Sequence, residues 1–156
     1  MSNALRWVPQ LQDGDVVRIP FADVRSALIH PADIGEVLAA GMAERNGSAV
    51  HRITGPQPLL PSEQLAVIAD ATGRPLRLEA QPDDEARAEM SSATPPEYVD
   101  AFFRFYRGGE LDESIVTTGV SDVLGRAPQT LDEWVADNSI PSGRPDPASR
   151  DGRVGR

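Results

Sequence analysis

The residues able to carry acid–base, nucleophilic or metal chemistry are few and scattered. The chain has two histidines, His30 and His51, each alone at the end of a predicted strand. Either could serve as a general base or a metal ligand. Neither has the spacing or the neighbouring carboxylates of a metal site. We therefore favour the interpretation that both are partly exposed structural residues, and we predict no metal site.

Other common kinds of catalytic residue are missing from the composition. Without cysteine the chain has no disulfide, no thiolate zinc site and no cysteine nucleophile. All 15 basic residues are arginine, so a catalytic lysine is excluded. No Gly-x-Ser-x-Gly turn is present, and residues 47–49 do not fit one. The acidic clusters at 83–85 and 110–113 are interpreted as solvated faces or turns. We predict no catalytic residue.

The charge and hydropathy exclude several partners. The 24 acidic residues outnumber the 15 basic ones and give a net charge of −9, which repels a phosphate backbone, so no nucleic-acid partner is expected. No apolar run approaches the roughly 18 residues of a membrane span, and no signal peptide pattern begins the chain. These features predict a cytoplasmic protein. Usage rich in alanine and arginine but free of lysine indicates a bacterial genome rich in GC.

Hydrophobic periodicity predicts an α+β fold of short strands and several helices. Strands are expected at residues 16–19, 26–29, 50–53 and 76–79. Helices are expected over residues 1–11, 31–42, 61–72, 83–90, 96–107, 118–124 and from 131 onward. The folded domain is predicted to span residues 1–140. Residues 141–156 lack apolar periodicity, and we expect a disordered tail there.

Three of these helices carry specific predictions. Beginning at Pro31, an apolar stripe is expected to face the core: Ile34, Val37, Leu38, Gly41 and Met42. Asp33 is placed to favour the dipole of that helix. Two capping boxes, Thr94 with Glu97 and Thr130 with Glu133, are expected to start two later helices.

The helix after Thr94 holds five of the eight aromatic residues. Its predicted buried face comprises Val99, Phe102, Phe103 and Tyr106. Phe105 falls off this face and needs a second surface. Core packing is the first interpretation of this aromatic helix; a ligand pocket or a partner surface is the second, and the sequence leaves both open.

Five short motifs occur in an order and spacing typical of one family. They are residues 3–7 (Asn-Ala-Leu-Arg-Trp), 29–35 (Ile-His-Pro-Ala-Asp-Ile-Gly), 52–56 (Arg-Ile-Thr-Gly-Pro), 60–64 with 73–75, and 125–128 with 133–134. Over residues 1–137 the chain resembles the C-terminal half of NmrA-like proteins, which are atypical short-chain dehydrogenases/reductases. In that family the N-terminal half is a Rossmann unit that binds NAD(P) through a glycine-rich turn.

The chain also departs from this family. It contains no G-x-G-x-x-G or G-x-x-G-x-x-G turn, and no lysine follows Tyr98 or Tyr106 as in the family's catalytic pair. Leu60 stands where a Thr or Ser cap is expected. The resemblance therefore implies the substrate side only: the last strands of the sheet and a helical lid. The residues that it implies for substrate binding are Asn3, Trp7, His30, Phe102 and Tyr106.

The function implied by this resemblance is the substrate-binding portion of an oxidoreductase-like protein that is not redox-competent alone. No cofactor is expected in this chain, and NAD(P) would enter only with a Rossmann-domain partner. One alternative is a stand-alone small-molecule binder or non-redox biosynthetic enzyme. Another is an interaction subunit: an apolar sheet edge and helix face left open by a missing Rossmann half would favour a homodimer or a Rossmann partner. A true short protein and a truncated reading frame both fit the sequence.

Overall fold

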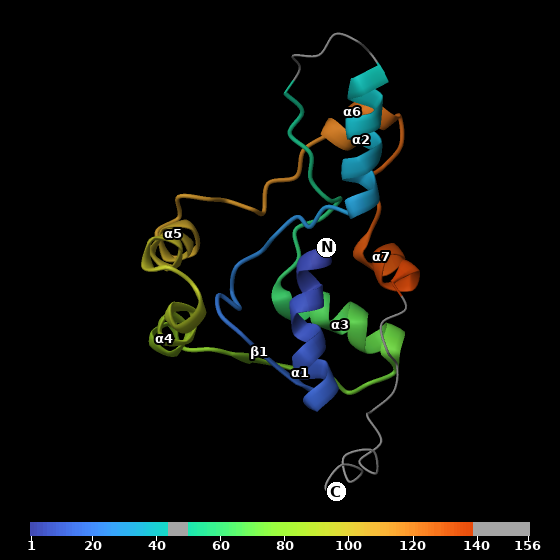
Figure 1. Cartoon of the computed structure of the whole chain (residues 1–156). Coiled ribbons are helices and arrows are strands. Elements are labelled where there is room, and N and C mark those ends of the chain that lie inside the picture. The colour runs from blue at the N-terminus through green and yellow to red at the C-terminus, as the bar shows by residue number, and fades with distance from the viewer. Residues whose placement is uncertain (44–49, 139–156) are drawn as a thin grey trace, which may run out of the picture.

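The computed structural model describes residues 1–43 and 50–138 of the chain (Figure 1). Within these ranges lie seven α-helices, one 3₁₀ helix and a parallel sheet of two strands. The predicted α+β fold is confirmed. The predicted domain end at residue 140 and the predicted tail at 141–156 lie outside the described residues.

The centre of the molecule is a small sheet covered by helices. The 3₁₀ helix η1 (Ser2–Trp7) continues into α1 (Val8–Asp13) and leads to β1 (Val16–Ile19), which pairs in parallel with β2 (Arg77–Ala80). Helix α3 (Pro61–Thr72) packs on β2, and α7 (Leu131–Asp137) packs on α3. The core between them includes Trp7, Leu11, Val17, Ile68, Leu131 and Trp134. Both predicted strands of this sheet are confirmed.

The buried face of the N-terminal helical segment differs from the predicted one. The spacing of Leu5, Val8 and Leu11 predicts that these residues share the buried face of a helix over residues 1–11, but Leu5 is exposed, whereas Ala4 and Trp7 are buried. Side chains three residues apart lie on the same side of a 3₁₀ helix, and in η1 the side that faces the core is the one with Ala4 and Trp7, not the one with Leu5. Ala4 and Trp7 therefore share the inner face, and Leu11 continues it in α1.

The outer edge of β1 is closed by a side chain. The Gln10 amide nitrogen donates to the backbone oxygen of Arg18 (3.0 Å), and the Arg18 N–H donates to Gln10 Oε1 (2.8 Å). The amide thus makes the two bonds that a neighbouring strand would make. The open sheet edge expected from the sequence is not found at β1.

Two predicted strands are extended segments without a ladder. Residues 26–29 make one antiparallel bridge, Ser26 with Leu59, and residues 50–53 have no strand assignment. The segments still pass very close together: the Gly55 N–H donates to the Ala27 oxygen (3.1 Å), and a Cβ on Gly55 would lie 1.8 Å from the Leu28 oxygen. Pro56 and Pro58 follow directly and lack the N–H groups that a ladder needs.

Helix α2 (Pro31–Ala43) packs against α6 (Gly119–Leu124) at one end of the molecule (Figure 1). The apolar stripe predicted to face the core is wrong for most of its length. Val37 is buried, but Ile34, Leu38 and Met42 are 38, 60 and 77% exposed. These three residues, four apart, form a continuous apolar stripe on the outer face, which we call the α2 stripe.

The inner side of α2 is anchored by Asp33, which is completely buried. Its carboxylate accepts hydrogen bonds from the backbone N–H of Gln129 (2.8 Å) and the Gln129 side chain (3.1 Å), and pairs with Arg126 (2.8 Å). Burial alone would raise the pKa of Asp33, but the bonds from Gln129 and Arg126 outweigh it and lower that pKa. Asp33 thus ties α2 to the loop before α7 instead of only complementing the helix dipole.

Helices α4 (Asp83–Ala93) and α5 (Pro96–Tyr106) pack on each other at one side of the molecule (Figure 1). The capping box predicted at Thr94 is wrong: the N-cap of α5 is Pro95, and no side chain caps it. Thr94 instead ends α4 in an extended conformation. The box predicted at Thr130 is confirmed, because its hydroxyl accepts from the Glu133 N–H and the Glu133 carboxylate accepts from the Thr130 N–H.

The two threonines provide a matched test of capping. Replacing Thr130 by Ala removes an N-cap acceptor and should lower the free energy of unfolding by about 1 kcal/mol. Thr94→Ala removes no cap and should change it by less than about 0.5 kcal/mol. Denaturant unfolding followed by circular dichroism measures both. Equal losses in the two variants would contradict the assigned caps.

Asp33 should make stability depend on pH. Asp33→Asn removes the negative charge that pairs with Arg126 and replaces one of the two acceptor oxygens by an N–H₂ donor, so it should destabilise the fold by about 3 kcal/mol at pH 7. Because the folded pKa of Asp33 is lowered, its contribution is present above the ordinary aspartate pKa and is lost as pH falls through the lowered value. The difference between wild type and variant should therefore shrink below about pH 4. Asp132→Asn, at an exposed position, is the control for unfolding measured across pH.

Candidate functional site

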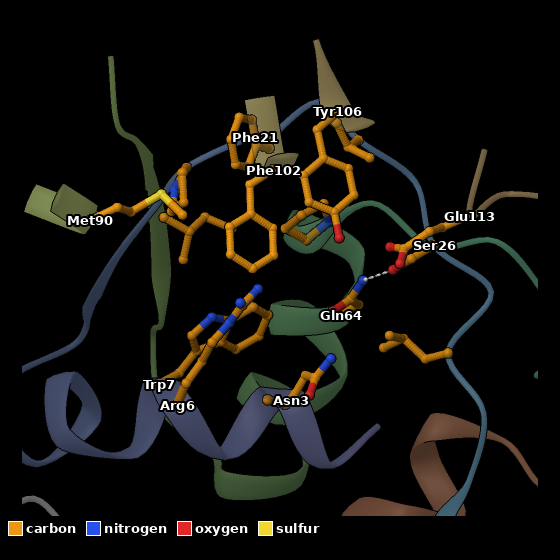
Figure 2. Close-up of a pocket in the computed structure, with 16 residues that line it drawn as sticks. Asn3, Arg6, Trp7, Phe21, Ser26, Gln64, Met90, Phe102, Tyr106 and Glu113 are labelled. Carbon is orange, nitrogen blue, oxygen red and sulfur yellow. Dashed lines mark hydrogen bonds between the residues drawn. The ribbon is translucent and has the colours of Figure 1, made fainter. Parts of the chain in front are cut away.

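A cavity of about 250 Å³ lies between η1, the segment after β1, α3 and α5 (Figure 2). Its apolar lining includes Trp7, Ile19, Phe21, Leu28, Met90 and Phe102. Its polar lining consists of Asn3, Arg6, Ser26, Gln64, Tyr106 and Glu113. Segments far apart in the sequence thus meet around one amphipathic space.

The structure brings together four of the five residues predicted to bind substrate. Asn3, Trp7, Phe102 and Tyr106 all line the cavity. His30 does not line it. Its ring is buried at the start of α2, where Nδ1 accepts from the Ala32 N–H (3.0 Å) and Nε2 lies 4.0 Å from an oxygen of Asp137. This ring caps backbone instead of facing the cavity, while His51 is exposed.

Phe21 is the main residue of this site that sequence reasoning missed. It is buried and adopts a left-handed backbone conformation with φ of 55°, which is uncommon for a bulky residue. Its ring centre lies 5.0 Å from that of Phe103, nearly edge to face, and 5.0 Å from that of Tyr106. No local sequence pattern indicates this conformation. The only available signal is a lone aromatic residue in a short loop after a strand.

Ion pairs connect α5 to the loop after β1 that contains Phe21. Arg107, directly after α5, pairs with Asp23 (2.7 Å) and with Asp83 at the start of α4 (2.8 Å). Its guanidinium also lies over the Phe21 ring, 5.2 Å from the ring centre. Arg87 of α4 covers Phe103 in the same way at 4.1 Å. The loop, α4 and α5 therefore form one wall of the cavity.

The sequence left two interpretations open for the aromatic helix α5, core packing and a ligand pocket. Each applies to different residues of the helix. Val99 is buried, and Phe103 packs under Arg87 and against Phe21. Phe102 and Tyr106 lie on the cavity side, with parallel rings 6.4 Å apart. Phe105 is half-buried and does not line the cavity. One helix thus supplies packing and a cavity wall at once.

Some of the polar side chains that line the cavity already form hydrogen bonds with protein groups. The Gln64 amide nitrogen donates to Ser26 Oγ (3.3 Å) and to the Leu59 oxygen (3.1 Å), so its oxygen remains available as an acceptor. Burial, the charge of Glu113 and a hydrogen bond to that carboxylate raise the pKa of Tyr106, and the positive charge of Arg6 partly opposes them. Tyr106 therefore stays protonated at neutral pH and donates to Glu113.

Two further features limit the chemistry of the described residues. Among them, no group of His, Asp and Glu side chains is arranged to hold a metal ion. Nor does any helix in residues 1–43 or 50–138 combine the length and apolar character needed to span a bilayer. What this cavity offers is apolar contact, amide and hydroxyl hydrogen bonds, one cation (Arg6) and one carboxylate (Glu113).

The Tyr106–Glu113 contact can be tested by titration. Tyr98→Phe leaves Tyr106 as the single tyrosine, whose pKa can be followed by the ¹³C shift of its ring carbon Cζ. Glu113→Gln in this background removes a negative charge and should lower the pKa of Tyr106. Glu110→Gln is the control, because Glu110 pairs with Arg104. Equal effects of the two substitutions would contradict the contact.

Comparison with known proteins places this geometry in a wider context. No protein-family model matches the chain. A curated protein of Streptomyces griseus, (4-alkanoyl-5-oxo-2,5-dihydrofuran-3-yl)methyl phosphate reductase, is 30% identical over 143 residues. The match covers 89% of this chain and 50% of that protein, so the chain spans about half the length of its curated relative.

Solved structures also match most of this chain over about half of their own length. An NADPH-dependent quinone oxidoreductase of Escherichia coli matches with a TM-score of 0.65 and 20% identity, over 87% of this chain and 50% of its own. A nucleoside-diphosphate-sugar epimerase of Staphylococcus aureus matches with 0.65 and 18% identity, over 83% and 46%. The triphenylmethane reductase of Citrobacter sp. matches with 0.63 and 11% identity, over 87% and 47%. The resemblance predicted from the motifs is confirmed: this chain is similar in sequence and in fold to about half of an NmrA-like, NAD(P)-dependent reductase or a related epimerase.

Proposed function

We propose that this chain is the substrate-binding portion of a cytoplasmic NAD(P)-dependent reductase-like protein and does not transfer hydride by itself. The observation that carries the proposal is the amphipathic cavity, which is walled entirely by this chain. Its volume of about 250 Å³ lies just below the range of roughly 300–1,000 Å³ found for drug-sized ligands. It therefore suits a small ring compound or one part of a larger molecule.

The helix N-termini support the second half of the proposal. Dinucleotide phosphates usually bind at a helix N-terminus with free N–H groups. In α3 and α7 that place is taken by the chain's own carboxylates: Glu63 accepts from the Leu60 N–H (2.7 Å) and Glu133 from the Thr130 N–H (2.7 Å). The first turn of α4 carries three acidic residues, and α5 begins with two prolines and a glutamate. A phosphate would meet negative charge at each of these four helices.

The nucleotide would then be held by another polypeptide segment, from a partner or from a longer chain. The α2 stripe is the surface on which we propose that this unit docks. Ile34, Leu38 and Met42 expose an apolar face along about two turns of helix, which is unfavourable in water. The relatives are about twice as long as the matched region, so they contain a further unit of similar size. A homodimer through the stripe is the competing arrangement.

A stand-alone small-molecule binder is the second candidate function. The residues of this chain alone bring apolar and polar groups together around the cavity, which favours it. The two candidates differ in what happens after binding: the binder needs nothing further, whereas the reductase portion needs a nucleotide-binding unit before its ligand is reduced.

Calorimetry with two ligands tests the proposal. The isolated chain should show no micromolar affinity for NADPH, and should bind a neutral alkanoyl furanone that has the same ring as the Streptomyces substrate. Phe102→Ala removes an aromatic wall of the cavity and should weaken furanone binding about tenfold.

Tyr98→Ala is the matched control. It deletes an exposed aromatic ring from the same helix, away from the cavity, and should leave the affinity within about twofold. Micromolar NADPH binding, or oxidation of NADPH by the chain alone, would refute the reductase-portion proposal. Equal losses in the two variants would show that the furanone binds elsewhere.

A further inference from the structure

The arginine side chains of the described residues divide into two groups. Most are paired with a carboxylate within 4.0 Å: Arg18, Arg25, Arg74, Arg87, Arg104, Arg107 and Arg126. Within residues 1–43 and 50–138, Arg6, Arg52 and Arg77 have no such pair. Since acidic residues outnumber basic ones in this chain, an arginine left without a carboxylate is the exception. Arg6 is the one of the three that lines the cavity between η1 and α5.

The position of Arg6 follows from the geometry of η1. In a 3₁₀ helix the side chains of residues i and i+3 lie one above the other, so Asn3 and Arg6 share a face. Both line the cavity, and the Asn3 amide forms no hydrogen bond with other described residues. A guanidinium and an amide N–H₂ therefore stand side by side as unused donors. Two such donors are suited to a planar or tetrahedral oxyanion.

The positive and negative side chains that line the cavity lie at different ends of it. Figure 2 shows Arg6 and Trp7 projecting from η1 toward Phe102, whereas Glu113 lies beside Ser26 and Tyr106 at another side of the view. The Glu113 carboxylate is engaged by the Tyr106 hydroxyl. An anion would therefore be attracted to the η1 end and repelled from the Glu113 end.

We propose that Arg6, assisted by Asn3, binds an anionic group of the ligand, a phosphate or a carboxylate, while the ligand's apolar body lies between Trp7 and Phe102. The inference rests on the proposed function, because it assigns a substrate class to the same cavity. It restricts that class to small apolar compounds with one acidic group. A neutral compound of the same shape would bind through apolar contact alone.

Three probes with one shared ring separate these contributions: 1-naphthylmethyl phosphate, 1-naphthylacetate and neutral 1-naphthylmethanol. Calorimetry on the wild-type chain should give an affinity at least tenfold higher for one or both anions than for the alcohol. A preference for the phosphate over the carboxylate, or the reverse, identifies which anion the site takes. In 0.5 M NaCl this advantage should shrink, because added salt screens an exposed guanidinium.

Two arginine variants locate the effect. Arg6→Gln should reduce the advantage of the anions over the alcohol to about twofold or less. Arg77→Gln removes the same charge from an exposed, unpaired position on β2 and should keep the advantage. Circular dichroism and denaturant unfolding confirm that both variants fold.

Each contrary outcome has a distinct meaning. If the wild type binds anions and alcohol equally, or if Arg6→Gln and Arg77→Gln lose equally, the role of Arg6 is refuted while the substrate-binding cavity stands. If anions bind best but Arg6→Gln keeps the preference, the anion site lies elsewhere and this inference fails. If no probe binds, the alcohol included, both the anion site and the proposed function are refuted.

Discussion

The ring of Phe21 sits between two aromatic side chains of α5, and the candidate site depends on this contact. Its positive φ is a conformation that costs a residue with a Cβ about 1–2 kcal/mol. The edge-to-face contact with Phe103 and the contact with Tyr106 contribute about 0.5–1.5 kcal/mol each beyond burial. Burying the ring adds roughly 2 kcal/mol more. The packing outweighs the strain, so the loop after β1 holds α5 at a fixed distance from η1.

Ion pairs around this contact orient the wall more than they stabilise it. Arg107 with Asp23 and Asp83, and Arg18 with Glu85, all involve side chains at least one third exposed on one side of the pair. Exposed pairs of this kind contribute about 0–1 kcal/mol each and weaken with salt. The aromatic contacts are buried and insensitive to salt. The shape of the cavity is therefore set by apolar packing, while the pairs select one orientation of α4 and α5.

Much of the fold follows from local chemistry. The Thr130 capping box, each of the two strands and the helix at residues 119–124 depend on residues close in sequence, and each was predicted. Contacts distant in sequence produced the differences. The face of α2 is set by Asp33 reaching Gln129, not by its apolar stripe. The cap of α5 is a local exception, because Pro95, next to Thr94, takes the N-cap position.

The residues of the candidate site also fall into a predicted group and a group that the sequence does not indicate. Motif resemblance placed Asn3, Trp7, Phe102 and Tyr106 in one group, and they do line one cavity. Nothing local to Phe21 indicates its left-handed backbone, and nothing local to Gln64 or Glu113 shows that they meet α5 and η1. The i, i+3 spacing puts Asn3 and Arg6 on a common face, but nothing local shows that this face meets the cavity.

The Gln10 amide that closes β1 also determines how this sheet can grow. A visiting strand needs exposed N–H and C=O groups, and those of Arg18 are already bonded. At Arg18, therefore, the edge of β1 cannot accept a further strand, and a strand added to this sheet would have to pair elsewhere.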